Sequence, residues 1–196
     1  MNYLGHLYLS KNRLDIMRSN LFGDFVKGSH FEHFPMTVQD GIILHRKIDD
    51  YIDRHPAVLE LLHVLYPRLP KVAGIAVDLY FDHILARDWE FYSDLTLTDF
   101  TLNFFNYEDK NEGYFSKEFK DLLRIIEEGK WLLNYESIDG LEFACKGLSS
   151  RISFENELKN GVNVFHENKE LIETTCLLYT SPSPRDRTRS RMPSSA

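Results

Sequence analysis

Histidine and aspartate residues gather in the first 83 positions of the chain. Seven of its eight histidines lie there, and five of the eight aspartates in the region are grouped with them here. Mixed imidazole and carboxylate ligands suit Mn²⁺, Fe²⁺ or Zn²⁺, and an oxygen-rich set favours Mn²⁺. The residues are His6, His30, His33, His45, His55, His63 and His83, with Asp24, Asp49, Asp53, Asp78 and Asp82.

Two of these pairs have helical spacing. His45 and Asp49 are four residues apart, as are Asp78 and Asp82. In a helix such pairs lie ~40° apart around the axis and ~6 Å along it, so two helices could bring them to one divalent cation. Asp24, Asp82 and the neighbouring His83 also stand inside apolar stretches, where an uncompensated carboxylate costs several kcal/mol. Each residue alone could be a surface acid or a core histidine, but together they favour a metal site.

Basic residues accompany the cluster along the chain. Arg46 follows His45, Lys27 comes three residues after Asp24, and Arg54 and Arg87 stand farther away. Such cations can neutralise the charge that builds on a phosphodiester in its transition state. Solvated helix charges are the alternative interpretation. No nucleotide-binding glycine loop, serine-nucleophile elbow or His-Glu-x-x-His motif occurs.

Apolar periodicity predicts an all-α fold, a single helical domain. No alternating, valine-rich segment typical of a strand occurs. We expect Thr37 to cap the helix that ends at Arg54, Thr98 to cap another, and Pro56 and Pro70 each to occupy the first turn of a helix. The expected helices span about 3–9, 12–27, 37–54, 71–91, 116–128, 139–150 and 153–174.

Composition limits the function classes. With 43% apolar residues and 196 positions, the chain can form one domain with a single core. Two cysteines without metal spacing and a start without a signal-peptide pattern favour the cytoplasm, and no segment is long and apolar enough for a membrane. A net charge of −7 disfavours nucleic-acid binding.

The composition changes near Cys176. Residues 177–196 are rich in Ser, Pro and Arg and lack an apolar stripe. We interpret them as a disordered, non-native tail that resembles translated sequencing adapter, and 1–176 as the folded domain.

Four stretches, taken in order, resemble bacterial acyl carrier protein phosphodiesterases, a family regarded as divergent HD-type phosphohydrolases. The resemblance covers about residues 1–175 and implies an HD-domain-like helical bundle. The stretches are 2–7 (NYLGHL), 23–28 (GDFVKG), 41–49 (GIILHRKID) and 78–89 (DLYFDHILARDW).

The resemblance implies hydrolysis of the phosphodiester that joins 4′-phosphopantetheine to a serine of holo acyl carrier protein, with Mn²⁺ as cofactor. The products are apo carrier protein and 4′-phosphopantetheine. It assigns metal binding to His6, Asp24, His45, Asp49, Asp78 and Asp82, catalysis to Asp24, His45, Asp82 and His83, and substrate binding to Lys27, Arg46 and Arg54.

Two other functions stay open. One is an HD-type, metal-dependent hydrolase of a nucleotide or another small phosphoester. The other is a non-catalytic helical interaction module, whose buried polar residues only specify packing. The oligomeric state does not follow from the sequence.

Overall fold

The computed structural model describes residues 3–180, and every regular element in that range is a helix. The prediction of a single all-α domain is therefore confirmed. The α-helices are α1 (Tyr3–Leu9), α2 (Leu14–Phe22), α3 (Met36–Arg54), α4 (Pro56–Leu65), α5 (Ala73–Arg87), α6 (Leu97–Asn106), α7 (Lys117–Glu128), α8 (Trp131–Asn134), α9 (Ile138–Arg151), α10 (Gly161–Glu167) and α11 (Lys169–Thr180). Short 3₁₀ turns add η1 (Gly23–Phe25), η2 (Trp89–Phe91), η3 (Glu112–Tyr114) and η4 (Leu158–Asn160).

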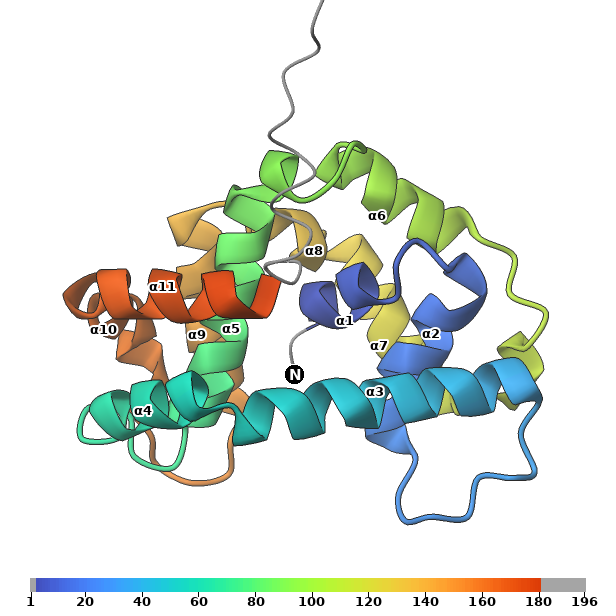
Figure 1. The fold of residues 1–196 in the computed structure, drawn as a ribbon, viewed down its shortest axis with the longest axis horizontal. Helices are drawn as coiled ribbons and strands as arrows, with labels where there is room; N and C mark the ends of the chain where they lie inside the picture. The colour runs from blue at the N-terminus through green and yellow to red at the C-terminus, as the bar shows by residue number, and fades with distance from the viewer. Residues whose placement is uncertain (1–2, 181–196) are drawn as a thin grey trace, which may run out of the picture.

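Helix α5 is the central element of the core. Most of its side chains are buried, including the aromatic Tyr80 and Phe81. A helix that is apolar on nearly all sides must be covered on nearly all sides. Helices α1, α4, α9 and α11 supply that cover. Helix α3 runs along one long edge of the molecule, and α1 and α2 lie against its inner side (Figure 1).

The element boundaries correct several predictions from sequence. Pro56 does begin α4, as expected. Thr37 does not cap α3, because the helix begins at Met36 and Pro35 is the capping residue. The carbonyl of Pro35 accepts from the amides of Val38 and Gln39, and the Thr37 hydroxyl accepts from the side chain of Asn111. Thr96, not Thr98, caps α6 by accepting from the amide of Asp99.

Three predicted long helices are also interrupted. The first is divided into α2 and η1, the segment expected at 71–91 into α5 and η2, and the segment expected at 153–174 into η4, α10 and α11. The segment expected from 71 begins only at Ala73, so Pro70 lies in a turn before α5 and not in its first turn. Helix α11 continues to Thr180, past the boundary expected at Cys176, and the remainder of the predicted tail lies outside the described residues. Within 3–180, no helix has the length and apolar character that crossing a bilayer requires.

Close contact between α2 and α3 depends on a glycine. A Cβ atom at Gly41 would lie 2.3 Å from Cβ of Ser19 and 2.8 Å from the amide nitrogen of Asn20. The second neighbour is backbone, so the two helices would have to separate. Residue 41 therefore sets the distance between α2 and α3, the helix that carries His45.

We predict that Gly41→Ala lowers the free energy of unfolding by about 1–3 kcal/mol, because the added methyl overpacks this contact. Gly74→Ala is the matched control, since a Cβ at Gly74 meets no atom within 4 Å. That control should gain about 0.5–1 kcal/mol from helix propensity. Urea unfolding of both variants measures the difference, and equal stabilities would contradict the packing argument.

Candidate metal centre

Three side chains from α1 and α3 converge on one point. His6, His45 and Asp49 each offer a ligand atom, and these atoms lie within 4.8 Å of one another. Nε2 of His6 is 3.2 Å from Oδ1 of Asp49, and Nε2 of His45 is 3.2 Å from Oδ2. The expected pairing of His45 with Asp49 on one face of a helix is confirmed. The histidines are buried and Asp49 is half-exposed, so the cluster opens to solvent on its carboxylate side.

A buried asparagine orients His6. The side-chain nitrogen of Asn20 donates to the carbonyl of His6 and to the hydroxyl of Ser10, so Oδ1 of Asn20 faces Nδ1 of His6 at 3.0 Å. An acceptor at that position places a proton on Nδ1, so in the neutral ring the lone pair is on Nε2 and can bind a metal. The rings of His6 and His45 stack with centroids 4.3 Å apart, which turns both Nε2 atoms toward Asp49.

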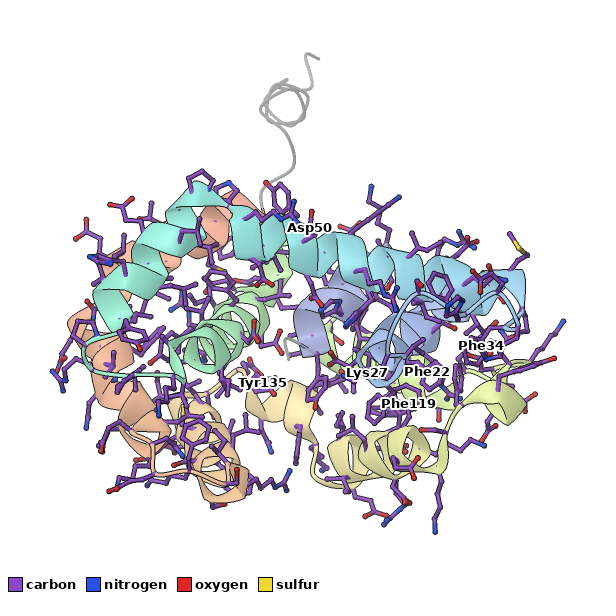
Figure 2. The ribbon with its side chains drawn as sticks, turned by 90° about the horizontal axis from the view of Figure 1, so that it is seen from below. Phe22, Lys27, Phe34, Asp50, Phe119 and Tyr135 are labelled. Carbon is purple, nitrogen blue, oxygen red and sulfur yellow. The ribbon has the colours of Figure 1, made fainter. Side chains whose placement is uncertain are left out.

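Asp24 joins the cluster through η1. Its Oδ1 is 3.3 Å from Nε2 of His45. The preceding Gly23 permits this approach, because a Cβ there would lie 2.4 Å from Cγ of His45. Phe22 and Phe25 hold the turn in place, since both pack against Phe119 of α7 with centroids 5.3 and 5.4 Å apart. Figure 2 shows Phe22 beside Phe119 and Phe34 in this aromatic group.

The two carboxylates change the protonation of His45. Burial alone would lower the pKa of His45, but hydrogen bonds and charges from Asp24 and Asp49 raise it to about 9. Burial would likewise raise the pKa of each aspartate, yet His45 outweighs burial and lowers both values. At neutral pH the metal-free cluster therefore contains an imidazolium between two carboxylates, and metal binding must release that proton.

Asp82 holds the beginning of α1. Its carboxylate is fully buried and accepts from the amides of Leu4 and Gly5 at 3.0 and 2.9 Å. These are amides of the first helical turn, which have no partner within the helix. Burial raises the pKa of Asp82 to about 7, although the two amides act in the opposite direction. This contact differs from the expected ligand role, which stays a prediction.

His83 and Asp78, the other candidates on α5, have different surroundings. Nδ1 of His83 donates to the carbonyl of Tyr135 at 2.7 Å, and its ring meets the edge of Phe165. Burial lowers the pKa of His83, so it has the contacts of a neutral core histidine. Asp78 is half-buried. The pKa of Asp53 is raised by burial and then by the charges of Asp49 and Asp78, so these three carboxylates lie near one another. Asp78 therefore stands near the acidic side of the cluster.

The three expected substrate cations separate in the structure. Lys27 is exposed, and its Nζ donates to the carbonyl of Asp24 at 3.1 Å, beside the cluster. Arg46 instead donates to the carbonyls of Val26 and Gly28, so it fixes the loop after η1. Arg54 pairs with Asp50, which lies on the outer side of α3 (Figure 2). Of the three, Lys27 has the position that a phosphate ligand needs.

The donor set fits a divalent transition metal. Ligand atoms around one small ion with bonds of about 2.1 Å are about 3 Å apart, and the nitrogen–oxygen contacts in the cluster are 3.2–3.3 Å. Two imidazoles and a carboxylate also have the chemistry of an Mn²⁺, Fe²⁺ or Zn²⁺ site. His6, His45 and Asp49 are the residues that would hold the ion, and Asp24 lies beside them in contact with His45.

Comparison with known proteins places this chain in a family. Residues 1–180 match the family described as acyl carrier protein phosphodiesterase. The chain belongs to this family. Proteins with the same name from Enterobacter sp. (strain 638) and Escherichia coli O6:H1 are 31% and 32% identical to it, over 77% of this chain and 79% of theirs. The phosphodiesterase of Photorhabdus laumondii is 28% identical over 77% of each chain. No solved structure matches.

The sequence did not single out Asn20 or Ser10, which support His6 in this phosphodiesterase fold. Both are fully buried or nearly so. Asn20 directly follows Arg18 and Ser19 in α2, so no apolar stretch marks it in the sequence as one marks Asp24. Its contacts with His6 and Ser10 could be found only from the fold.

We predict that the metal-free protein loses stability between neutral pH and pH 9. The folded pKa of His45, about 9, lies above its unfolded value of 6.5. Stabilisation by the ion pairs is thus complete below pH 6.5 and disappears as pH rises through 9. The loss is at most about 3 kcal/mol, and less because both carboxylates are partly solvated. Urea unfolding in EDTA measures the free energy of unfolding at each pH. Asp49→Asn should make this free energy depend less on pH. If the dependence is unchanged in the variant, His45 is not its source.

We further predict that Asp82→Ala lowers the free energy of unfolding by about 2–3 kcal/mol, because two buried amides lose their acceptor. Asp139→Ala, at an exposed first-turn position of α9, is the control and should cost a few tenths of a kcal/mol. Chemical denaturation compares them. If Asp82→Ala were as stable as the control, the carboxylate would not be needed to hold α1.

Proposed function

We propose that this chain hydrolyses the phosphodiester that links 4′-phosphopantetheine to the serine of holo acyl carrier protein. The products are the apo carrier protein and 4′-phosphopantetheine. The observation that carries the proposal is the convergence of His6, His45 and Asp49 at a solvent-open point, with Asp24 in contact with His45. Membership of the phosphodiesterase family supports the same substrate.

We assign the cofactor as Mn²⁺, because the cluster combines two imidazoles with the Asp49 carboxylate and has a second carboxylate, Asp24, beside it. Such an ion supplies Lewis acidity toward a phosphoryl oxygen and lowers the pKa of bound water. The chain's part is to fix the donors. Asn20 holds Nε2 of His6 toward the site, and Gly23 allows Asp24 to reach His45.

Asp24 and Lys27 provide the remaining charges. The carboxylate of Asp24 lies beside the cluster, 3.3 Å from Nε2 of His45, and can accept a proton from the attacking water. Lys27 places a cation beside Asp24, where it can neutralise a non-bridging oxygen of the phosphate. The electron pair of the broken P–O bond stays with the serine oxygen, which takes up a proton as it leaves.

Docking of an acidic carrier protein needs a positive surface. The chain is acidic overall, but residues 1–90 carry 10 Lys and Arg against 12 Asp and Glu, whereas residues 91–176 carry 9 against 17. Lys27 and Lys47 are exposed on the elements that form the cluster. We therefore place the carrier protein on the α3 and η1 side, where electrostatic repulsion is smallest.

The decisive experiment incubates the chain with holo acyl carrier protein and Mn²⁺ and follows the carrier by intact mass. We expect loss of the phosphopantetheine mass, inhibition by EDTA and recovery with Mn²⁺. His45→Gln and Asp49→Asn should reduce turnover by at least 100-fold, a rough figure for the loss of a metal ligand. Lys27→Gln should reduce it about 10–100-fold through lost charge stabilisation.

Lys159→Gln, an exposed lysine on η4, is the control for Lys27→Gln and should keep full activity. A carrier that stays intact while the folded protein holds metal would refute the carrier substrate and favour a small phosphoester. Purification without stoichiometric metal, with indifference to EDTA, would favour the interaction module.

A further inference from the structure

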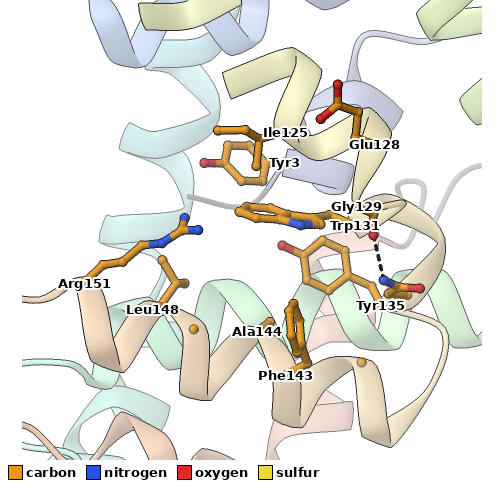
Figure 3. A pocket seen from close by; sticks show the side chains of 13 residues that line it. Tyr3, Ile125, Glu128, Gly129, Trp131, Tyr135, Phe143, Ala144, Leu148 and Arg151 are labelled. Carbon is orange, nitrogen blue, oxygen red and sulfur yellow. Dashed lines mark hydrogen bonds between the residues drawn. The ribbon is translucent and has the colours of Figure 1, made fainter. Parts of the chain in front are cut away.

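A second feature of the molecule is an apolar pocket of about 440 Å³ between α1, α7, α8 and α9. Its walls are formed by Ile125, Trp131, Phe143 and Leu148, and Tyr3 closes the side toward α1 (Figure 3). Phe143 is 65% exposed, although large aromatic side chains are normally covered. A pocket of this size with few polar groups has the character of a binding site for a small apolar group.

The polar groups of the pocket are poorly suited to a second phosphate. Among the described lining residues, Arg151 is the single cation and Glu128 the single carboxylate. The guanidinium of Arg151 lies over the Trp131 ring, 5.4 Å from its centroid, and thereby extends the aromatic wall. An anionic ligand would meet Glu128 and apolar walls, so the lining favours an uncharged, apolar occupant.

The pocket and the histidine cluster share helix α1. Tyr3 lines the pocket and His6, three residues later, belongs to the cluster, which is about one helical turn away. Burial, followed by the charges of Asp24 and Asp82, raises the pKa of Tyr3. The carboxylate of Asp24 is thus close enough to act on the Tyr3 phenol, and the pocket begins beside the cluster.

We infer that this pocket receives the acyl chain carried on the prosthetic arm of the substrate, so that the enzyme accepts acylated carrier protein and prefers longer chains until the pocket is full. The inference rests on the proposed carrier-protein substrate. A phosphodiester at the cluster would leave the arm beside α1, and the pocket offers apolar surface to what the arm carries. Each buried methylene contributes about 0.8 kcal/mol, equivalent to about a fourfold change in KM.

Gly147 allows a direct test. It lines the pocket from α9, and a Cβ at this position meets no atom within 4 Å. Gly147→Phe therefore fills the space without a backbone clash. Gly74→Phe is the matched control, because Gly74 is an exposed helical glycine on α5, outside the pocket, and also meets nothing within 4 Å. Thermal unfolding establishes that both variants fold.

Turnover is then measured with Mn²⁺ on carrier protein bearing a free thiol, a butyryl, an octanoyl or a decanoyl group. For the wild type and Gly74→Phe we expect KM to fall with chain length. For Gly147→Phe we expect the free-thiol and butyryl substrates to be cleaved normally, while the longer chains lose the gain, at least about tenfold for decanoyl. Equal KM values for all chains in the wild type, or a uniform loss in Gly147→Phe, would overturn the inference.

A binding measurement separates this inference from the proposed function. S-decanoyl-pantetheine is titrated into metal-free protein, and tryptophan fluorescence is followed. Trp131 lies in the pocket wall, whereas Trp89, the other tryptophan, is buried in the core. We expect saturable binding that is lost in Gly147→Phe and kept in Gly74→Phe. Binding without cleavage of any carrier would leave the pocket assigned and refute the proposed function, whereas cleavage without binding would do the reverse.

Discussion

The site depends on the close approach of η1 to His45. The imidazole of His45 contacts Asp49 of its own helix and Asp24 of η1. Asp24 can reach it only if the backbone of η1 comes close to the ring, and Gly23 permits this because it has no side chain. The approach brings Asp24 within 3.3 Å of Nε2, and the aromatic residues on either side of this turn hold it against α7. The packing of α3, η1 and α7 thus determines the geometry of the contacts that His45 makes with Asp24 and Asp49.

This geometry also determines the electrostatic state of the metal-free protein. Two carboxylates around a buried histidine make an ion pair, which stabilises the closed arrangement of α3 and η1 in place of a cation. A divalent ion at this point would displace that proton, because metal ligands must be deprotonated. The charges that hold the imidazolium are therefore the charges that such an ion would meet.

Local spacing predicted the part of the site that lies within one helix. His45 and Asp49 share a face of α3 because four residues make about one turn, and no tertiary contact is needed to know it. The apolar setting of Asp24 and Asp82 correctly indicated that both are compensated. It could not indicate the means of compensation, which is His45 for Asp24 and the amides of α1 for Asp82.

Other differences also come from tertiary structure. Arg46 follows His45 in sequence, yet consecutive helical residues point about 100° apart, and its guanidinium donates to loop carbonyls. Its expected role in substrate binding stays a prediction. Thr96 and not Thr98 caps α6, because the helix begins at Leu97, two residues before the start that a Thr98 cap would give. The pocket around Tyr3 joins segments more than 120 residues apart, and no local pattern contains that information.

Helix α1 connects these features, and it is too short to be stable alone. A seven-residue helix in water does not repay the cost of its first turn. Asp82 satisfies amides at its beginning, and Asn20 and Ser10 bind the carbonyl of His6 near its end. Buried polar bonds at both ends thus fix its position and its rotation about the axis. Tyr3 faces the pocket and His6 faces the cluster. Any loss of those bonds would therefore displace the pocket wall and the cluster together. This is a reason for buried polar groups around a helix that apolar contacts alone could also have held.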